Sequence, residues 1–285
     1  MKVILNIIKF IVITILTICV ISIGIITTVS STLLNQSYIT QELEETKFYT
    51  EIYELVKSNF ENYIYQSGLD EEVLNDICTE EKVKNDLNII LNNIFQGTNE
   101  KIDTTEISNK LHANIDELGI KNSKNEKAIE QFVTQICNEY TNTVLHTEYE
   151  DNIHNMYIKV NTILSRVYDI STIMLVLGII VLAILNFKKP SKNIQGIGIM
   201  LFATAIFNFI ICSIITSKVN IQGIKVFNDA FSNVIVNVLQ ETIHQIMSFG
   251  AGTFAVGIIF IAIYSAIMAK NNSKENIIEE KTTDK

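Results

Sequence analysis

The densest group of side chains with chemical potential lies in residues 65–86, YQSGLDEEVLNDICTEEKVKND, which hold seven carboxylates and one cysteine. Clustered carboxylates can bind a divalent metal, share a catalytic proton, or begin helices, whose first turns favour negative charge. The DxDxDG pattern of a calcium loop is missing. We therefore interpret the cluster as two consecutive helix starts.

Helix initiation explains five of the seven carboxylates, and the other two are expected on helix surfaces. Thr79 is expected to cap a helix, and Lys84 is expected to pair with Glu80 four residues earlier. Asp76 and Asp86 are expected on solvated faces. The two helix starts account for the other five carboxylates: Asp70, Glu71, Glu72, Glu80 and Glu81.

Two histidines suggest a metal site. His146, Glu150 and His154 recur every four residues and would share one helical face. Eight residues of helix rise about 12 Å, whereas zinc ligands lie about 2 Å from the ion. At most two of these side chains could therefore reach one metal without help from another helix. A solvated helix face explains the pattern equally well, and we predict no metal site.

The four cysteines fall into two pairs. Cys19 and Cys212 lie in apolar runs, where a thiol behaves as a small apolar residue. Cys78 and Cys137 lie in the polar part of the chain, and they could form a disulfide outside the cytosol or remain separate thiols beside apolar residues. The sequence has no CxxC motif and no zinc spacing.

Catalytic motifs are missing, since the sequence has no GxSxG, SxxK or HExxH and no glycine-rich phosphate loop. We predict no catalytic, cofactor-binding or metal-ligating residue, expect no cofactor, and do not expect an enzyme. Glycines at 196–198 and 250–252 open long apolar runs and are expected to let helices pack closely. Two further pairs have the same small-residue spacing: Ala251 with Ala255, and Thr253 with Gly257.

Four apolar runs without a charged residue organise the chain. Each is long enough for an α-helix to cross roughly 30 Å of hydrocarbon. They raise the hydrophobic content to 48% and the mean hydropathy to +0.27. The runs are residues 10–29, 170–187, 196–216 and 249–269.

Lysines set the expected orientation. Lys188, Lys189 and Lys192 lie between the second and third runs, and other lysines precede the first run and follow the fourth. These segments are expected in the cytoplasm, because short cytoplasmic segments carry the excess of lysine. The first run follows Lys2 and Lys9 as a signal peptide would, but its length favours an uncleaved signal-anchor over a cleaved signal.

The sequence thus predicts an all-α protein of the plasma membrane, with four transmembrane helices and an extracytoplasmic helical bundle between spans 1 and 2. Both termini are expected in the cytoplasm. The predicted segments are a short N-terminus at 1–9, span 1 at 10–29, the extracytoplasmic domain at 30–169, span 2 at 170–187, a cytoplasmic loop at 188–195, span 3 at 196–216, an extracytoplasmic amphipathic segment at 217–248, span 4 at 249–269 and a cytoplasmic tail at 270–285.

Charge is unevenly distributed along the chain. Residues 38–169 hold 25 acidic and 11 basic residues, a net charge of −14, which argues against a nucleic-acid partner. The spans hold no Asp, Glu, Lys, Arg or His, which disfavours an ion-coupled transporter. Asn208 in span 3 is expected to hydrogen-bond a neighbouring helix rather than line a polar path. Arg166 is expected to anchor the outer interface.

The exported domain is predicted to be helical, because its apolar residues recur at helical spacing and it lacks proline. Gly68, Gly97 and Gly119 each follow an apolar stripe, where a left-handed residue would end the helix. Two pairs have capping-box spacing: Asp103 with Glu106, and Ser123 with Glu126. The apolar stripes begin at Ile52, Val83, Ile107, Ile129 and Ile153.

The amphipathic segment 217–248 has three possible placements. It could lie in the outer headgroup region, dock on the exported helices, or continue helically into span 4. Lysines are few in it, so strong adsorption to anionic lipid is not implied. Docking on the exported helices is the interpretation that we prefer.

Short stretches in the first half of the exported domain carry a family resemblance: Phe48-Tyr49 with Ile52-Tyr53, Ser67-Gly68-Leu69, Thr79-Glu80 with Val83, and Ile102-Asp103. With these stretches, the chain resembles four-span membrane proteins of low-GC Gram-positive bacteria that have one span, a helical exported domain and three further spans. The resemblance implies this topology, and it implies no activity.

Three functions are compatible with the sequence: a non-enzymatic envelope protein, a permease-like subunit and an envelope enzyme. The first, which we favour, is a non-enzymatic protein that senses, binds or scaffolds at the bacterial cell envelope. Its expected partners are the lipid bilayer and an envelope or membrane protein, and the sequence leaves the oligomeric state open. The third is an envelope enzyme with scattered carboxylates.

The second function is a permease-like subunit that couples a cytoplasmic partner to the exported domain. The order of its segments is similar to that of the cell-division permease-like protein that activates wall hydrolases. The chain departs from that pattern because it lacks a substantial cytoplasmic N-terminal segment and its loop between spans 2 and 3 is short.

Overall fold

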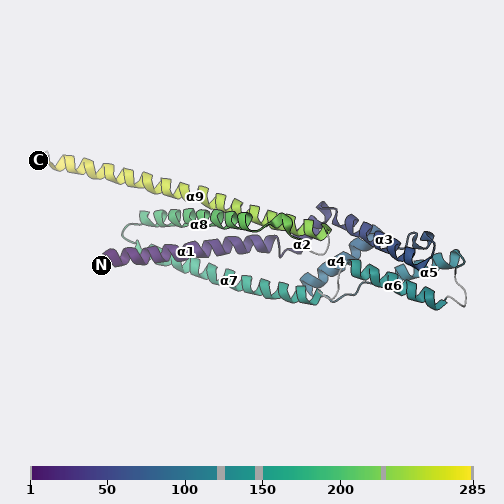
Figure 1. The fold of residues 1–285 in the computed structure, drawn as a ribbon. Helices are drawn as coiled ribbons and strands as arrows, with labels where there is room; N and C mark the ends of the chain where they lie inside the picture. Colours follow the sequence, from purple (N-terminus) through teal and green to yellow (C-terminus); the bar gives the residue numbers. More distant parts are fainter. Residues whose placement is uncertain (1, 121–125, 145–149, 226–228, 284–285) are drawn as a thin grey trace. The chain divides into compact units, whose positions relative to one another are not determined.

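The structure, a computed structural model, describes residues 2–120, 126–144, 150–225 and 229–283, and within these ranges it is all-α without a strand. The chain divides into two compact units (Figure 1). Unit 1 comprises Met1–Leu34, Asn161–Ile224 and Val238–Lys285. Unit 2 comprises Asn35–Val160 and Lys225–Asn237.

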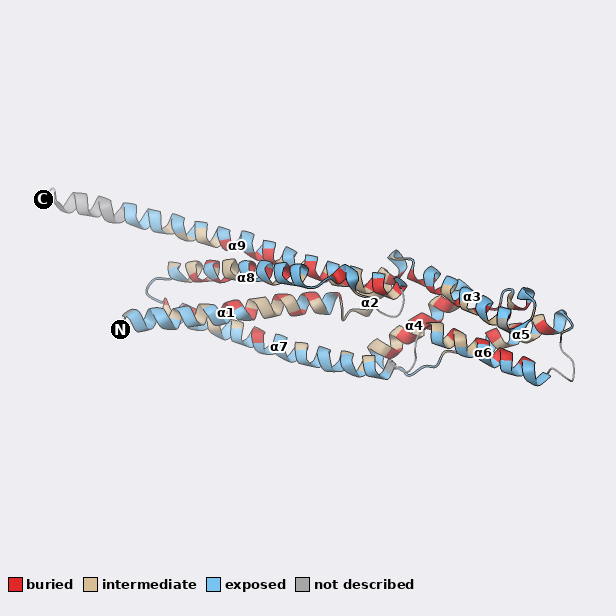
Figure 2. Cartoon of the chain, viewed as in Figure 1, coloured by how far each residue is buried: buried red, intermediate tan, exposed pale blue. Residues whose placement is uncertain are grey.

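Unit 2 is built from short amphipathic helices around one core. Its elements are α2 (Gln36–Glu45), α3 (Phe48–Ser67), η1 (Glu71–Leu74), α4 (Glu80–Gln96), α5 (Thr105–Glu117), α6 (Glu126–Val144) and the start of α7 (Glu150–Leu185). Helix α3 contacts α2, α4, α6 and η1, and α5 contacts α6 and η1. The predicted apolar stripes that begin at Ile52, Val83, Ile107 and Ile129 form the core, which confirms the helical prediction for these segments (Figure 2). Fully buried members include Ile52, Val56, Val83, Ile107, Leu111, Ile115 and Ile136. The stripe from Ile153 is helical but largely exposed, with Met156 at 66%.

Glycines end the helices of unit 2 as predicted. Gly68, Gly97 and Gly119 have φ angles of 72°, 70° and 65°. A residue with a Cβ atom is strained in this left-handed conformation, so glycine is the natural stop signal there. Of the two capping pairs, the one with Ser123 lies outside the described residues. The predicted box of Asp103 with Glu106 is wrong, because Thr104 is the N-cap of α5 and Glu106 pairs with Lys110 at 3.1 Å. Asp103 accepts a hydrogen bond of 2.8 Å from the backbone N–H of Thr105.

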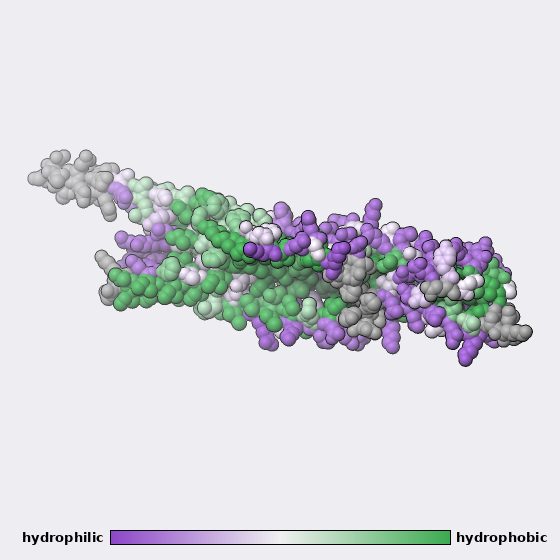
Figure 3. Space-filling model, viewed as in Figure 1, coloured by the Kyte–Doolittle hydropathy of each residue, from purple (hydrophilic) through white to green (hydrophobic). Residues whose placement is uncertain are grey.

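Unit 1 holds long apolar helices. These are α1 (Lys2–Ser31), most of α7, α8 (Ser191–Lys218), the short η3 (Ile221–Gly223) and most of α9 (Asp229–Thr283). In the described part of the chain, four helices are long and apolar enough to cross a membrane, which confirms the prediction of four membrane helices. Hydrophobic side chains cover their surfaces (Figure 3). On a soluble protein, an exposed apolar surface of this extent would indicate an interaction site. On these helices it is compatible with contact to lipid.

The helices of unit 1 pack through small residues. A Cβ atom on Gly257 would lie 3.0 Å from the backbone N of Phe202, and one on Gly198 would lie 3.3 Å from the backbone O of Gly257. Helices α8 and α9 therefore approach closely at these glycines, as predicted. Of the two small-residue pairs, Thr253 and Gly257 are buried, whereas the pair formed by Ala251 and Ala255 is exposed.

Lysine-bearing segments gather at one end of unit 1. The start of α1, the connection between α7 and α8, and the C-terminal part of α9 lie at the same end (Figure 1). The connection holds Lys188 and Lys189, and Lys192 lies in the first turn of α8.

The amphipathic segment before span 4 is part of α9. Helix α9 begins at Asp229 and includes residues 249–269 without a break. Its first turns belong to unit 2, where the ring of Phe231 lies edge-on to that of Phe48, with centroids 4.7 Å apart. The segment thus combines helical continuation into the fourth span with a contact to α3.

Candidate functional site

The carboxylate cluster of residues 65–86 is largely used to begin helices. Asp70 accepts a hydrogen bond of 3.1 Å from the backbone N–H of Glu72 at the start of η1. Thr79 accepts one of 3.2 Å from the backbone N–H of Lys82 at the start of α4. Glu80 and Glu81 lie in the first turn of α4, where they favourably meet the positive end of the helix dipole.

Two predictions for this cluster are wrong. Lys84 does not pair with Glu80, because its Nζ lies 2.8 Å from Oε1 of Glu44 in α2. Glu80 instead accepts a hydrogen bond of 2.6 Å from the Thr50 hydroxyl. Asp86 does not lie on a solvated face, since only 5% of it is exposed. It follows Val83 by three residues and precedes Leu87, so it faces the same core as they do.

Asp86 is the centre of a buried polar network. Its Oδ2 lies 3.1 Å from Lys82 Nζ and accepts a hydrogen bond of 2.5 Å from the Tyr140 hydroxyl. Lys82 also donates a hydrogen bond of 2.8 Å to the backbone O of Asp103, and its ammonium lies over the Tyr140 ring. The network joins α4 and α6 to Asp103, which lies just before α5. A buried charge is tolerated only when it is paired in this way.

The titratable neighbours of Asp86 are held in their protonated forms. Burial raises the pKa of Tyr140 far above its usual range, and the hydrogen bond to Asp86 raises it further. Burial also raises the pKa of the Cys78 thiol to about 11, although Lys82 lowers it. At neutral pH neither a thiolate nor a phenolate forms, so these groups are poor nucleophiles. The arrangement holds helices together.

A small hollow in unit 2 is lined by two carboxylates of this cluster and by one of α3. It has a volume of about 320 Å³ and lies where α3 meets η1 and the chain that follows it. Tyr53 and Phe60 supply aromatic surface, and Glu61, Glu71 and Asp76 supply negative charge. Lys57 also lines the hollow, and its ammonium lies 5.5 Å from the centroid of the Tyr53 ring, so a cation of the chain itself already contacts this aromatic surface. Three carboxylates and one lysine leave the lining with a net negative charge.

The predicted histidine face is only partly described. His146 and the side chain of Glu150 lie outside the described residues. His154 Nδ1 lies 2.7 Å from the backbone O of Ile94, and its ring lies against Gly97, so it fastens α7 to the end of α4. Among the described residues, no group of three or more His, Cys, Asp or Glu side chains could hold a metal.

The cysteines are separate thiols in the described structure. Cys78 is buried in unit 2, and Cys137 lies beside the backbone O of Thr104, with its Sγ 3.9 Å away. Cys19 and Cys212 are buried in α1 and α8. Of the two alternatives for Cys78 and Cys137, the structure has the unpaired thiols.

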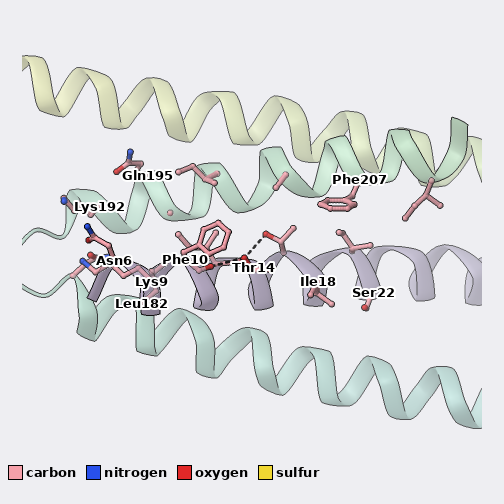
Figure 4. Close-up of a pocket in the computed structure, with 18 residues that line it drawn as sticks. Asn6, Lys9, Phe10, Thr14, Ile18, Ser22, Leu182, Lys192, Gln195 and Phe207 are labelled. Carbon is pink, nitrogen blue, oxygen red and sulfur yellow. Dashed lines mark hydrogen bonds between the residues drawn. The ribbon is translucent and has the colours of Figure 1, made fainter. Parts of the chain in front are cut away.

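In unit 1, a groove of about 890 Å³ lies between α1 and α8 (Figure 4). Residues 6–22 of α1 form one wall and residues 192–211 of α8 form the other, and Leu182 of α7 and Asn186, which directly follows α7, complete the lining. Its polar lining gathers at one end, where Figure 4 shows Asn6, Lys9, Lys192 and Gln195. Beyond these residues, the lining is mostly apolar.

Sequence reasoning missed this groove, although α1 carries a signal for it. Asn6, Lys9, Thr14 and Thr17 recur at intervals of three to five residues and thus share one face of the helix. Against the apolar background of α1, these polar positions mark the wall of the groove. The opposing wall could not be foreseen, because nothing in the sequence pairs α1 with α8.

Asn208 is fully buried, and no described group hydrogen-bonds its side-chain amide. The predicted hydrogen bond to a neighbouring helix is therefore not formed within the described residues. Its Cβ atom lies against Gly250 of α9. Asn208 does not line the groove between α1 and α8.

Arg166, which was expected to anchor the outer interface, is exposed.

Comparison of the chain with protein-family models, curated proteins and solved structures finds no match.

Proposed function

We propose that this chain is a non-enzymatic membrane protein of a bacterial cell envelope, whose unit 2 is exported and binds or scaffolds an envelope protein. The lysines at one end of unit 1 support this orientation, because short cytoplasmic segments are enriched in lysine. Unit 2 would then follow the first span and lie on the opposite side of the membrane.

The observation that carries the proposal is the closed network around Asp86. Catalytic acids and bases are usually tuned toward the working pH and face a cleft. In unit 2, the buried charges of Lys82 and Asp86 contact each other instead, and the pKa values of Cys78 and Tyr140 are moved away from neutrality. The interior of unit 2 thus serves stability, which leaves its surface for function.

That surface favours a basic partner. Residues 38–169 have a net charge of −14, and complementary charge steers association and selects partners. The hollow around Glu61, Glu71 and Asp76 stays net negative although Lys57 also lines it, so it is the place where a lysine or arginine side chain of the partner would bind the carboxylates. We therefore assign the contact to this hollow.

Orientation can be tested first. Reporter fusions at Asn125 and Lys192 should report opposite sides of the membrane, with Lys192 in the cytoplasm. Fusions that report the same side would contradict the proposed topology.

Binding can be tested with a photocrosslinking residue at Tyr53 in intact cells. A crosslink to an envelope protein with a basic surface is expected. It should be lost in the variant Glu61→Gln/Glu71→Gln/Asp76→Asn and retained in a matched variant on other helices, Asp116→Asn/Glu117→Gln/Glu130→Gln. Equal loss in both variants, or reproducible recovery of a cytoplasmic ATPase as the main partner, would count against the proposal.

A further inference from the structure

We propose that the groove between α1 and α8 binds one anionic glycerophospholipid from the leaflet at the lysine-bearing end of unit 1. An acyl chain lies along the apolar part of the groove, and the phosphate lies at the mouth between Lys9 and Lys192. This site is in a different unit from the proposed protein-binding surface and is independent of it.

The length of the groove fits one lipid chain. Its apolar lining extends from Phe10 to Ser22 on α1 and from Ile199 to Ile211 on α8. Each stretch covers twelve residue steps, or about 18 Å of helix. One leaflet of hydrocarbon is about 15 Å thick, half of the roughly 30 Å core. The volume of about 890 Å³ lies within the range of roughly 300–1,000 Å³ found for ligand sites.

The walls of the groove suit a hydrocarbon chain. The hydroxyls of Thr14 and Thr17 donate hydrogen bonds of 3.0 and 2.9 Å to the backbone O atoms of Phe10 and Ile13 in their own helix (Figure 4). Hydroxyls bonded in this way do not demand a polar partner from a ligand. Leu182 of α7, which is 1% exposed and packs with Leu16 and Met200, closes the groove with apolar protein behind its lining.

The mouth of the groove suits an anion. Lys9 is half-buried and Lys192 is exposed, and among the described residues no carboxylate lines the groove. The sequence has no Asp or Glu at all in residues 1–34 and 170–228, so neither lysine is neutralised by a nearby carboxylate on these segments. Basic pockets between membrane helices bind anionic headgroups, and the amides of Asn6 and Gln195 can donate further hydrogen bonds to phosphate oxygens.

The two lysines also predict selectivity for the headgroup. Phosphatidylglycerol brings a phosphate and no positive charge, whereas phosphatidylcholine brings a quaternary ammonium toward the same lysines. Like charges in close proximity disfavour binding, so the site discriminates by repulsion as well as by attraction. A lysine near the membrane surface contributes about fivefold to the binding of anionic lipid, so two lysines give roughly ten- to thirtyfold.

The absence of tryptophan from the chain permits a direct test. In the full-length variant Phe207→Trp, the only tryptophan lies in the wall of the groove. The protein is reconstituted in phosphatidylcholine vesicles that contain a small, equal fraction of brominated phosphatidylglycerol or brominated phosphatidylcholine. Bromine quenches tryptophan only at short range. Brominated phosphatidylglycerol is expected to quench at a roughly ten- to thirtyfold lower fraction.

Two matched controls make the result specific. Lys9→Gln/Lys192→Gln should abolish the preference, while Lys188→Gln/Lys189→Gln, which removes the same charge outside the groove, should preserve most of it. A reporter at Ile180→Trp on α7, where the native residue is 50% exposed, should be quenched equally by both lipids. The proposal is overturned if Phe207→Trp is quenched equally by both lipids, if both lysine variants lose the preference alike, or if neither lipid quenches it because protein fills the groove.

Discussion

Unit 2 buries the charged side chain of Asp86 at 5% exposure with two partners, whereas unit 1 buries Asn208 completely with no described partner for its amide. The contrast extends to the packing residues. The core of unit 2 is formed by Ile, Leu, Val and aromatic side chains, while α8 and α9 meet through Gly198 and Gly257. The two units are therefore stabilised by different forces.

The difference follows from the solvent that each unit suits. In water, burial of apolar side chains stabilises a fold by about 25 cal/mol per Å², so short helices suffice when their stripes meet. In lipid the tails are as apolar as leucine, and helices associate through close packing instead. A polar group loses its hydrogen bonds to water on burial in unit 2 and therefore needs pairing. An unpaired amide in unit 1 is at least as costly, because hydrocarbon offers no hydrogen bond. The predictions below test this contrast, beginning with the largest expected effect.

The largest effect is expected from Asp86→Ala. The substitution leaves the Lys82 ammonium and the Tyr140 hydroxyl buried without their carboxylate partner. Breaking a buried ion pair on one side costs about 3–5 kcal/mol. Hydrogen exchange measured by mass spectrometry should show faster opening of α4 and α6 in unit 2, with no change in α8. The exposed control Asp116→Ala should change the opening free energy by less than about 0.5 kcal/mol. Unchanged exchange in α4 would contradict the role of the network.

A second effect should appear at alkaline pH. The pKa of Cys78 is raised from 9.0 to about 11 in the folded protein, and the pKa of Tyr140 is raised in the same direction. Because the folded state holds these protons more tightly, the stabilisation is complete below about pH 9 and is lost as the pH rises through 11. For Cys78 alone the loss approaches about 2–3 kcal/mol, since one pKa unit corresponds to 1.36 kcal/mol.

The measurement is the free energy of unfolding of unit 2 by denaturant at pH 8 and at pH 10.5, followed by circular dichroism. Cys78→Ala should reduce the difference between the two pH values, while Cys19→Ala in α1 should leave it unchanged. An identical pH dependence in Cys78→Ala would show that another group controls the loss.

The same substitution is expected to have opposite effects in the two units. Asn93 in unit 2 donates a hydrogen bond of 2.8 Å to the backbone O of Glu100 and accepts one of 2.9 Å from its N–H. Asn93→Leu should therefore destabilise unit 2 by about 1–3 kcal/mol. Asn208→Leu removes an amide that no described group satisfies, so the thermal midpoint of unit 1 should stay constant or rise. A clear fall would reveal a partner for Asn208.

The sequence predicted the helices well and the site poorly, for a physical reason. Apolar spacing reflects which side of a helix is buried, so most buried residues of the stripes in α3, α4, α5 and α6 were foreseen. Gly68, Gly97 and Gly119 were foreseen because a positive φ angle requires a particular residue type. These are local properties of the chain, readable without knowledge of any partner helix.

Pairing between helices is not local, and there the predictions were incomplete. Lys84 was expected to pair within α4 but lies closer to Glu44 of α2. Asp86 was placed in water because charged residues are rarely buried, although its position beside Leu87 put it on the core stripe. The groove requires knowledge that α1 lies against α8, which no periodicity in either helix conveys.

The smallest net effects are expected from single methyl groups in α9, because gain in helix stability and cost in packing oppose each other. Replacing a helical glycine by alanine removes backbone freedom and stabilises a helix by about 0.5–1 kcal/mol when space is available. A Cβ atom on Gly252 would have no neighbour within 4 Å, so Gly252→Ala should raise the thermal midpoint of unit 1 slightly. A Cβ atom on Gly257 would lie 3.0 Å from the backbone N of Phe202.

Gly257→Ala should therefore lower that midpoint, because separating α8 and α9 costs about 1–3 kcal/mol and outweighs the gain in helix stability. Circular dichroism of the full-length variants in lipid nanodiscs measures both midpoints under the same conditions. Opposite changes in the thermal midpoint at two positions five residues apart in one helix would indicate that α8 and α9 pack by close approach. If both variants were stabilised equally, helix propensity alone would govern α9, and the contrast between lipid-type and water-type packing would not hold for this helix pair.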